Sequence, residues 1–131
     1  LSTLLRGLKQ HTSNITAIVT VTDDGGGSGR LVREKNIIPP GDIRNCLVAL
    51  ADADKAMGDL FQFRFDRTSG SLAGQSMGNL LIAALADQAK GDFERAVRIA
   101  GEVLAIRGKV VPSTFAHVGL VAKFDGGETV S

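Results

Sequence analysis

The amino-acid sequence predicts an α/β fold with a mostly parallel sheet and helices on both faces. Three observations predict it: a nearly unbroken apolar run at residues 15–21, helical periodicity before and after that run, and glycine- or proline-rich turns between the segments. An apolar, β-branched run of this length is typical of a strand covered on both faces, as in a parallel sheet.

The first half of the chain predicts a helix, a strand and a second helix. Four leucines recur at helical spacing over residues 1–10, which predicts a helix with one buried face. Residues 15–21 predict the strand. Asp42 is a good N-cap, so a further helix is expected from Asp42 to about Asp54. Its inward residues are expected to be Ile43, Cys46, Leu47, Leu50 and Ala51.

The second half predicts an extended segment, two helices and three short strands. Phenylalanines at 61, 63 and 65 alternate with polar residues, which indicates a short strand or extended segment with its aromatic rings inward. Residues 79–89 predict a helix that Gly91 ends, and Asp92 caps the next one. A strand over residues 109–111 stops at Pro112, and residues 118–124 and 128–130 predict a strand pair around a turn.

The length fits one domain, since 131 residues bury roughly two-thirds of the surface that the unfolded chain exposes. The chain begins at Leu1, already inside a helical pattern and without Met, and it ends within the last strand pair. We therefore expect residues 1–131 to be a fragment of one α/β domain that lacks a preceding strand and turn and a C-terminal part.

Composition excludes several classes of partner. A formal net charge of +1 provides no overall field for nucleic acid or an acidic membrane, so an anion must be bound locally. The single cysteine, Cys46, lies among apolar residues and is expected to be a buried, reduced thiol. With no apolar run of about 20 residues and no signal-peptide pattern, a cytoplasmic protein is expected. The sequence leaves a monomer and a homo-oligomer equally open.

The first candidate site is the segment from Thr22 to Arg30, which follows the predicted strand. Open α/β sheets bind ligands at the carboxyl ends of their strands, and glycine backbone N–H groups can point at phosphate oxygens. The segment lacks the Walker spacing and the G-x-G-x-x-G spacing, and a flexible surface loop is the alternative. The candidate residues are Asp23, Asp24, Gly25, Gly26 and Ser28.

Asp23 and Asp24 need an explanation of their own, because adjacent carboxylates repel both each other and a phosphate. They suggest Mg²⁺, a ribose or sugar hydroxyl, or an N-cap for the next helix. No cofactor is certain from these residues, and Mg²⁺ is the one metal they suggest.

The second candidate site is the proline-rich turn at residues 39–45, which leads into the predicted helix at Asp42. Backbone N–H groups in the first turn of a helix are a common seat for phosphate, and Arg44 would add a bidentate cation. The alternative is an ordinary helix start with Arg44 in solvent. The candidate residues are Gly41, Asp42, Arg44 and Asn45.

Three further groups of residues carry weaker signals. Ser76, Gly78 and Asn79 form another polar helix start, while Arg107 and Thr114 offer a cation and a hydroxyl near a strand. For Arg107 and Thr114, a surface arginine and a capping hydroxyl are the alternatives. His11 and His117 have no Cys or His partner at ligand spacing, which argues against a zinc site.

Four separated motifs resemble the bacterial gluconeogenesis factor family, which is related to the 2-phospho-L-lactate transferases. The resemblance covers nearly the whole chain and implies a Rossmann-like fold. The motifs are Thr22-Asp23-Asp24-Gly25-Gly26, Pro39-Pro40-Gly41-Asp42-Ile43-Arg44-Asn45-Cys46-Leu47, Gly78-Asn79-Leu80-Leu81, and Leu104-Ala105-Ile106-Arg107-Gly108 with Pro112-Ser113-Thr114.

The resemblance also carries functional expectations. It implies binding of a nucleotide sugar such as UDP-glucose or UDP-N-acetylglucosamine, and support of cell shape and wall synthesis on gluconeogenic carbon sources. It further implies that Asp24 and Asp42 occupy positions where the transferases place metal- or substrate-binding carboxylates. A phosphotransferase reaction with Mg²⁺ across Asp24 and Asp42 is therefore the alternative function.

Two positions depart from the family pattern. Gly27 stands where the pattern has serine, and Gln75-Ser76-Met77 replaces an expected His-Ser-Phe. The missing imidazole at Gln75 removes a candidate acid or base, which favours binding over catalysis.

Overall fold

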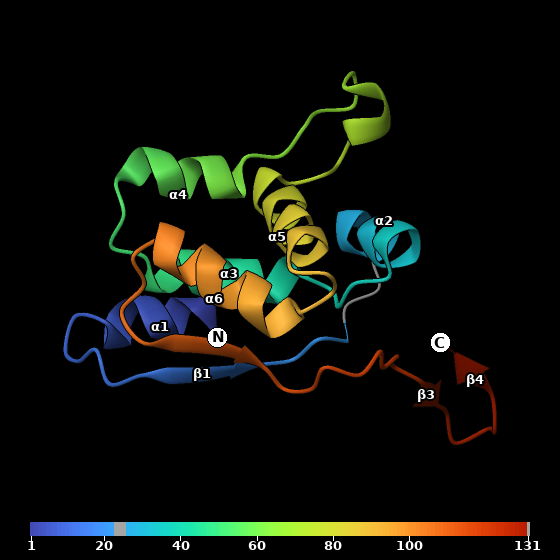
Figure 1. Cartoon of the computed structure of the whole chain (residues 1–131). Coiled ribbons are helices and arrows are strands. Elements are labelled where there is room, and N and C mark those ends of the chain that lie inside the picture. Colours follow the sequence, from blue (N-terminus) through green and yellow to red (C-terminus); the bar gives the residue numbers. More distant parts are fainter. Residues whose placement is uncertain (23–25, 131) are drawn as a thin grey trace.

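A computed structural model describes residues 1–22 and 26–130, with the backbone alone over 26–28. Two parallel strands lie beneath a layer of helices, and a small hairpin extends from the C-terminal side (Figure 1). The elements are α1 Ser2–Leu8, β1 Thr16–Val19, α2 Gly26–Lys35, α3 Gly41–Leu50, α4 Lys55–Gln62, the 3₁₀ turn η1 Gly70–Leu72, α5 Met77–Gln88, α6 Phe93–Val103, β2 Lys109–Pro112, β3 Ala122–Lys123 and β4 Thr129–Val130.

The parallel pairing of β1 with β2 confirms the α/β class. Thr16 pairs with Lys109 and Val19 with Pro112, so the carboxyl ends of both strands lie at the same edge. Between them the chain passes through α2 to α6, and α3 packs on both strands. Parallel strands joined through helices place their carboxyl ends at one edge of the sheet, where α/β folds bind ligands.

Helices cover one face of this strand pair, whereas the sequence predicted helices on both. Along β1 the inward residues Ala17 and Val19 are buried against the helical layer, whereas Ile18 on the other face is 67% exposed. In the part of the chain that the structure describes, the helices lie on one side of β1 and β2 (Figure 1), so one of the two expected covered faces is seen.

The core lies between the strands and the helices. Each fully buried aliphatic or aromatic side chain contributes roughly 1.5–3 kcal/mol to folding. The largest apolar side chains with almost no exposure are Phe61, Ile43, Leu47, Leu50, Ile82, Leu104 and Val21. Three of these seven, Ile43, Leu47 and Leu50, belong to α3, and Leu104 directly follows α6. These two helices therefore connect the strand layer to the outer helices.

Several predicted boundaries agree with the structure. The predicted helix at 79–89 is α5, Asp92 caps α6 by accepting a hydrogen bond from the N–H of Arg95 at 3.0 Å, and the C-terminal strand pair is antiparallel. The prediction for α1 overestimated its buried face. Leu5 is the one buried leucine of this helix, whereas Leu1, Leu4 and Leu8 are exposed.

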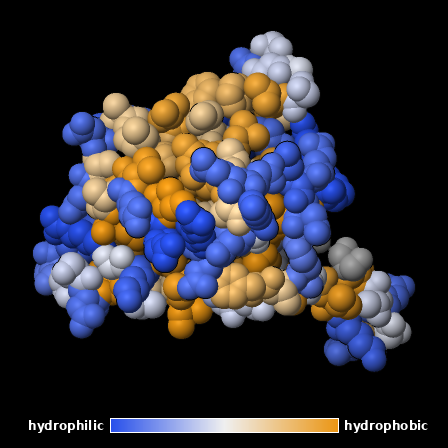
Figure 2. All heavy atoms as spheres, in the orientation of Figure 1, coloured by the Kyte–Doolittle hydropathy of each residue, from blue (hydrophilic) through white to orange (hydrophobic). Residues whose placement is uncertain are grey.

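The helix α4 was not predicted, and the phenylalanine alternation has two origins. Phe61 is buried at the end of α4, whereas Phe63 and Phe65 lie in an extended segment after it, with their rings edge to face at 5.2 Å. Phe63 is half exposed, so the expected inward row of three rings is wrong. Apolar residues gather over α4 and the segment that follows it, whereas hydrophilic residues cover α2 (Figure 2).

The turn into β2 requires glycine. Gly108 has φ +110°, and a Cβ there would lie 2.5 Å from the carbonyl oxygen of Ile15. Both facts exclude a larger residue, because L side chains rarely adopt this backbone conformation and the neighbouring backbone cannot move away cheaply. Within residues 1–22 and 26–130, no helix is long and apolar enough to cross a membrane.

Candidate functional site

A hollow of about 260 Å³ lies at the carboxyl end of β1, where α1 begins and α3 passes. Thr20 borders it from the strand end, Ser2 from the start of α1, and Asp42 and Asn45 from α3. Its remaining lining residues, Leu1, Ile18, Val19 and Cys46, supply apolar wall. The hollow thus joins polar groups from three separate segments at the edge where α/β folds bind ligands.

Two other hollows are somewhat larger but carry less convincing chemistry. One, of about 420 Å³, is an open groove between α6 and β2 lined largely by apolar residues. The other, of about 290 Å³, lies beside the ends of α2 and α5, where Lys35 and Asp87 form an ion pair. Size alone does not identify a site, and the polar groups at the strand end favour the hollow beside α3.

The start of α3 fixes the position of Asp42. Pro40 is the N-cap residue, and its carbonyl accepts the first helical hydrogen bond from the N–H of Arg44 at 2.8 Å. Asp42 therefore lies in the first turn, and the prediction that it is the N-cap is wrong. The two prolines preset the backbone for helix entry without a capping side chain, and a carboxylate in the first turn is favoured by the helix dipole.

Arg44 is buried, with 6% exposure, and joins α3 to α5. Its Nη1 donates to Ser76 Oγ at 2.6 Å and to Asn79 Oδ1 at 2.8 Å. The alternative of a solvent-exposed arginine is therefore wrong. Because these guanidinium contacts are to the protein itself, Arg44 acts in this structure by holding the two helix starts together.

Ser76 and Gly78 adapt the start of α5 to this arginine. Ser76 is the N-cap of α5 and accepts a hydrogen bond from the N–H of Asn79 at 3.0 Å, as well as the one from Arg44. A Cβ on Gly78 would lie 2.5 Å from the carbonyl oxygen of Phe61 and 2.7 Å from Arg44 Cδ. Gly78 is therefore needed because backbone and guanidinium stem pass directly against it.

Asn45 connects this network to the hollow. Its Oδ1 accepts hydrogen bonds from Arg44 Nη2 at 3.1 Å and from Gln62 Nε2 at 3.3 Å. Two donors on one oxygen fix the orientation of the amide. The sequence pattern does not indicate Gln62, because the alternating phenylalanines around it predict an extended segment, whereas Gln62 ends helix α4.

The predicted aspartate–glycine loop is only partly described. Asp23, Asp24 and Gly25 lie outside the described residues, as does the side chain of Ser28, so no position is assigned to the tentative metal carboxylate Asp24. Gly26 already belongs to α2, so the loop is shorter than the glycine run suggested. Arg30 on α2 donates to the carbonyls of Ser71 and Ala73, which ties this helix to the η1 segment.

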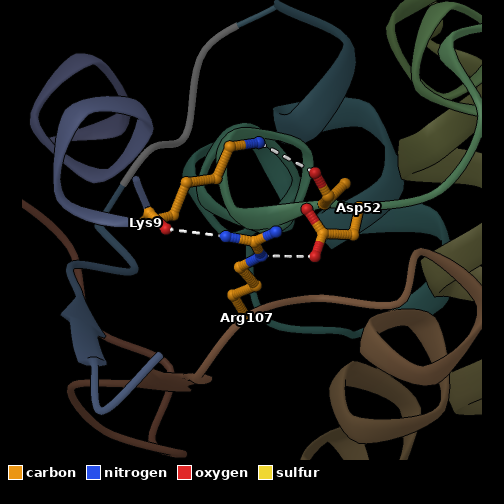
Figure 3. Close-up of polar contacts among 4 residues, drawn as sticks. Lys9, Asp52 and Arg107 are labelled. Carbon is orange, nitrogen blue, oxygen red and sulfur yellow. Dashed lines mark hydrogen bonds and ion pairs between the residues drawn. The ribbon is translucent and has the colours of Figure 1, made fainter. Parts of the chain in front are cut away.

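Arg107 lies at the opposite edge of the strands, before β2 begins. Its side chain forms an ion pair with Asp52 and donates to the carbonyl oxygen of Lys9 at 3.0 Å, while Lys9 Nζ donates to the carbonyl of Ala51 at 2.8 Å (Figure 3). Arg107 thus ties the ends of α1 and α3 together, apart from the other candidate residues. Thr114 follows the carboxyl end of β2, and its Oγ1 accepts a hydrogen bond from the N–H of Ala116.

Replacing Arg107 by glutamine is therefore expected to affect stability and not ligand binding. The exposed ion pair and the hydrogen bond to Lys9 together contribute about 1 kcal/mol, because solvent screens both. Urea denaturation measures this loss, with Arg33→Gln on the exposed face of α2 as the control. Weaker nucleotide binding by Arg107→Gln with unchanged stability would contradict the assignment.

Two other side chains bear on possible chemistry. Burial raises the pKa of the Cys46 thiol, so this free cysteine beside the hollow is protonated near neutral pH and is a poor nucleophile. Gln75 is buried, and its Oε1 has no hydrogen-bond partner among the described residues. Residues 1–22 and 26–130 contain no group of three His, Cys, Asp or Glu side chains placed to hold a metal.

Comparison with known proteins identifies the family. The family model described as 2-phospho-L-lactate transferase CofD matches residues 1–131. The chain belongs to the CofD family. A protein of Nostoc sp. is 55% identical to this chain over 130 residues. The match covers 99% of this chain and 28% of the Nostoc protein.

Relatives of this CofD-family chain include proteins named gluconeogenesis factor. That of Bacillus subtilis is 53% identical over 131 residues, and the chain spans 41% of its length. A crystal structure of a Bacillus halodurans protein superposes with a TM-score of 0.92 at 47% identity, covering 98% of this chain and 41% of that one. The resemblance to gluconeogenesis factors is confirmed, and the chain spans less than half the length of these relatives.

Proposed function

We propose that this CofD-family protein binds a nucleotide sugar, such as UDP-glucose or UDP-N-acetylglucosamine, and acts as a cytoplasmic regulator. In this role it supports gluconeogenic growth, cell shape and cell wall synthesis. The observation that carries the proposal is the hollow at the carboxyl end of β1, bordered by Ser2, Thr20, Asp42 and Asn45. Rossmann-like folds bind nucleotides at this edge.

The distribution of charge supports a ligand held mainly by neutral groups and backbone. The net charge is +1, and Asp42 is the one charged side chain that lines the described hollow. Bulk positive charge therefore does not attract the diphosphate. The diphosphate would instead be held by backbone N–H groups at the start of α2. This ten-residue helix follows β1 and opens with glycines.

A thermal-shift panel on the full-length gene product tests this function. A ligand that binds only the folded state at one hundred times its Kd stabilises it by about 2.7 kcal/mol. We expect UDP-glucose or UDP-N-acetylglucosamine to raise the melting temperature, with glucose and inorganic phosphate as controls that do not. No shift with any nucleotide or nucleotide sugar would overturn the proposal.

A second candidate, a phosphotransferase, is favoured by the CofD family match itself. In such an enzyme Asp24 and Asp42 would hold Mg²⁺, which would neutralise the diphosphate, while a bound hydroxyl would attack its distal phosphorus, form a new P–O bond and displace the nucleoside monophosphate. The protonated Cys46 and the glutamine at position 75 provide no evident base. Incubation with nucleotide diphosphate donors and Mg²⁺ distinguishes the two functions, since released nucleotide supports the transferase.

A further inference from the structure

Asn45 presents a hydrogen-bond donor beside the carboxylate of Asp42. The oxygen of the Asn45 amide is occupied by Arg44 and Gln62, so the group left for a ligand is the Nδ2 amide, which has no other partner among the described residues. Asp42 lies three residues earlier on α3, and residues at this spacing are neighbours on one helix face. Both line the hollow at the end of β1.

This arrangement is unsuited to a phosphate. The carboxylate of Asp42 is exposed and repels an anion, and the lining of the hollow within the described chain contains no lysine or arginine. Ser2 and Thr20 add hydroxyls that both donate and accept hydrogen bonds. The lining therefore matches a neutral group with several hydroxyls.

We infer that Asp42 and Asn45 bind a vicinal diol, with one hydroxyl donating to the Asp42 carboxylate and its neighbour accepting from Asn45 Nδ2. The inference rests on the proposed nucleotide-sugar function and specifies which part of the ligand α3 recognises. The diol is the 2′,3′-diol of the ribose or the 2,3-diol of the attached glucose, and the two sources differ in which deoxy analogue loses affinity.

Calorimetric titration of the full-length gene product tests the inference with three ligands: UDP-glucose, its 2′-deoxyribose analogue, and its 2-deoxyglucose analogue. We expect one analogue to bind at least about tenfold more weakly than UDP-glucose, because it lacks a hydrogen bond to a charged group. In the Asp42→Asn variant, the affinities for UDP-glucose and for that analogue should differ by less than about threefold. The reason is that the hydroxyl that the analogue lacks no longer has a charged partner in this variant. Loss with the ribose analogue assigns the ribose, and loss with the other assigns the sugar.

Asp54→Asn is the matched control, because Asp54 is exposed at the start of α4, makes no capping hydrogen bond and does not line the hollow. It should discriminate between the ligands as the unaltered protein does. If UDP-glucose binds and both analogues bind equally well, the diol inference is overturned while the proposed function stands. If no nucleotide sugar binds, the proposed function fails as well.

Discussion

Replacing Arg44 with alanine is expected to lower the free energy of unfolding by about 3 kcal/mol. The variant loses the hydrogen bonds to Ser76 and Asn79 across two helices and the one to Asn45, and it leaves a gap where the buried stem packs against Gly78. Hydrogen bonds to a charged group contribute roughly 1.5–3 kcal/mol, and a buried gap adds to the loss. Urea denaturation followed by circular dichroism measures the change.

Two further substitutions serve as comparisons for the Arg44→Ala variant. Arg44→Lys keeps the charge but not the planar fork, so it should recover less than half of the loss. Arg33→Ala, on the exposed face of α2, should change stability by no more than about 0.5 kcal/mol. An Arg44→Ala protein as stable as the unaltered one would mean that the link between α3 and α5 contributes nothing to folding.

Replacing Gly78 with alanine is expected to cost about 1–2 kcal/mol, although alanine is the better helix former. The added Cβ would meet the carbonyl oxygen of Phe61 at 2.5 Å and the stem of Arg44 at 2.7 Å, so backbone and helix must move apart. Overpacking of this kind typically costs 1–3 kcal/mol, more than the roughly 1 kcal/mol that helix propensity returns. Thermal and urea denaturation give the difference.

Gly58→Ala is the matched control for this prediction. Gly58 lies within α4, and its added Cβ would meet one side-chain atom at 4.0 Å, an ordinary contact. This variant should gain up to about 1 kcal/mol. A stabilised Gly78→Ala protein would show that the close approach of α3, α4 and α5 is not as described.

The two sites should also be coupled. Arg44→Ala removes one of the two clashes that Gly78→Ala creates, whereas the clash with the Phe61 carbonyl remains. The double variant should therefore lose less stability than the sum of the single losses, by more than the roughly 0.5 kcal/mol expected of independent sites. Additive losses would argue against direct contact.

Periodicity was sufficient to predict the elements that carry the core. The parallel pair, α3, α5 and α6 have strong apolar patterns, and Asp92 accepts the capping hydrogen bond of α6 from the N–H of Arg95. The boundaries of α3 were shifted, because Pro39-Pro40-Gly41 starts the helix before the apparent cap at Asp42. Local propensity and tertiary packing agree in these segments, which is why the sequence was informative.

The missed helices have weak or misleading patterns. Glycines open α2, and their low helix propensity suggested a loop, yet the helix packs on α5 and Arg30 anchors it. In α4 the period-two phenylalanines extend past the helix end at Gln62 and conceal it. In both cases contacts between distant segments decide the conformation, and a single sequence does not show them.

The structure brings some of the predicted site residues together and separates others. The motif at residues 39–45 and the strand end at Thr20 do border one hollow. Arg44 and Arg107 were both proposed as ligand cations, but one is buried in a helix-to-helix network and the other lies at the far edge of the strands. Charge and motif membership alone cannot reveal which partner an arginine finds inside the protein.

A crystal structure of the full-length gene product with bound UDP-glucose tests the central claim most directly. We expect a ribose or sugar ring in the hollow between α1 and α3, within hydrogen-bond distance of Asp42 and Asn45, and the diphosphate toward the start of α2. A ligand bound in the groove between α6 and β2, or beside Arg107, would contradict it.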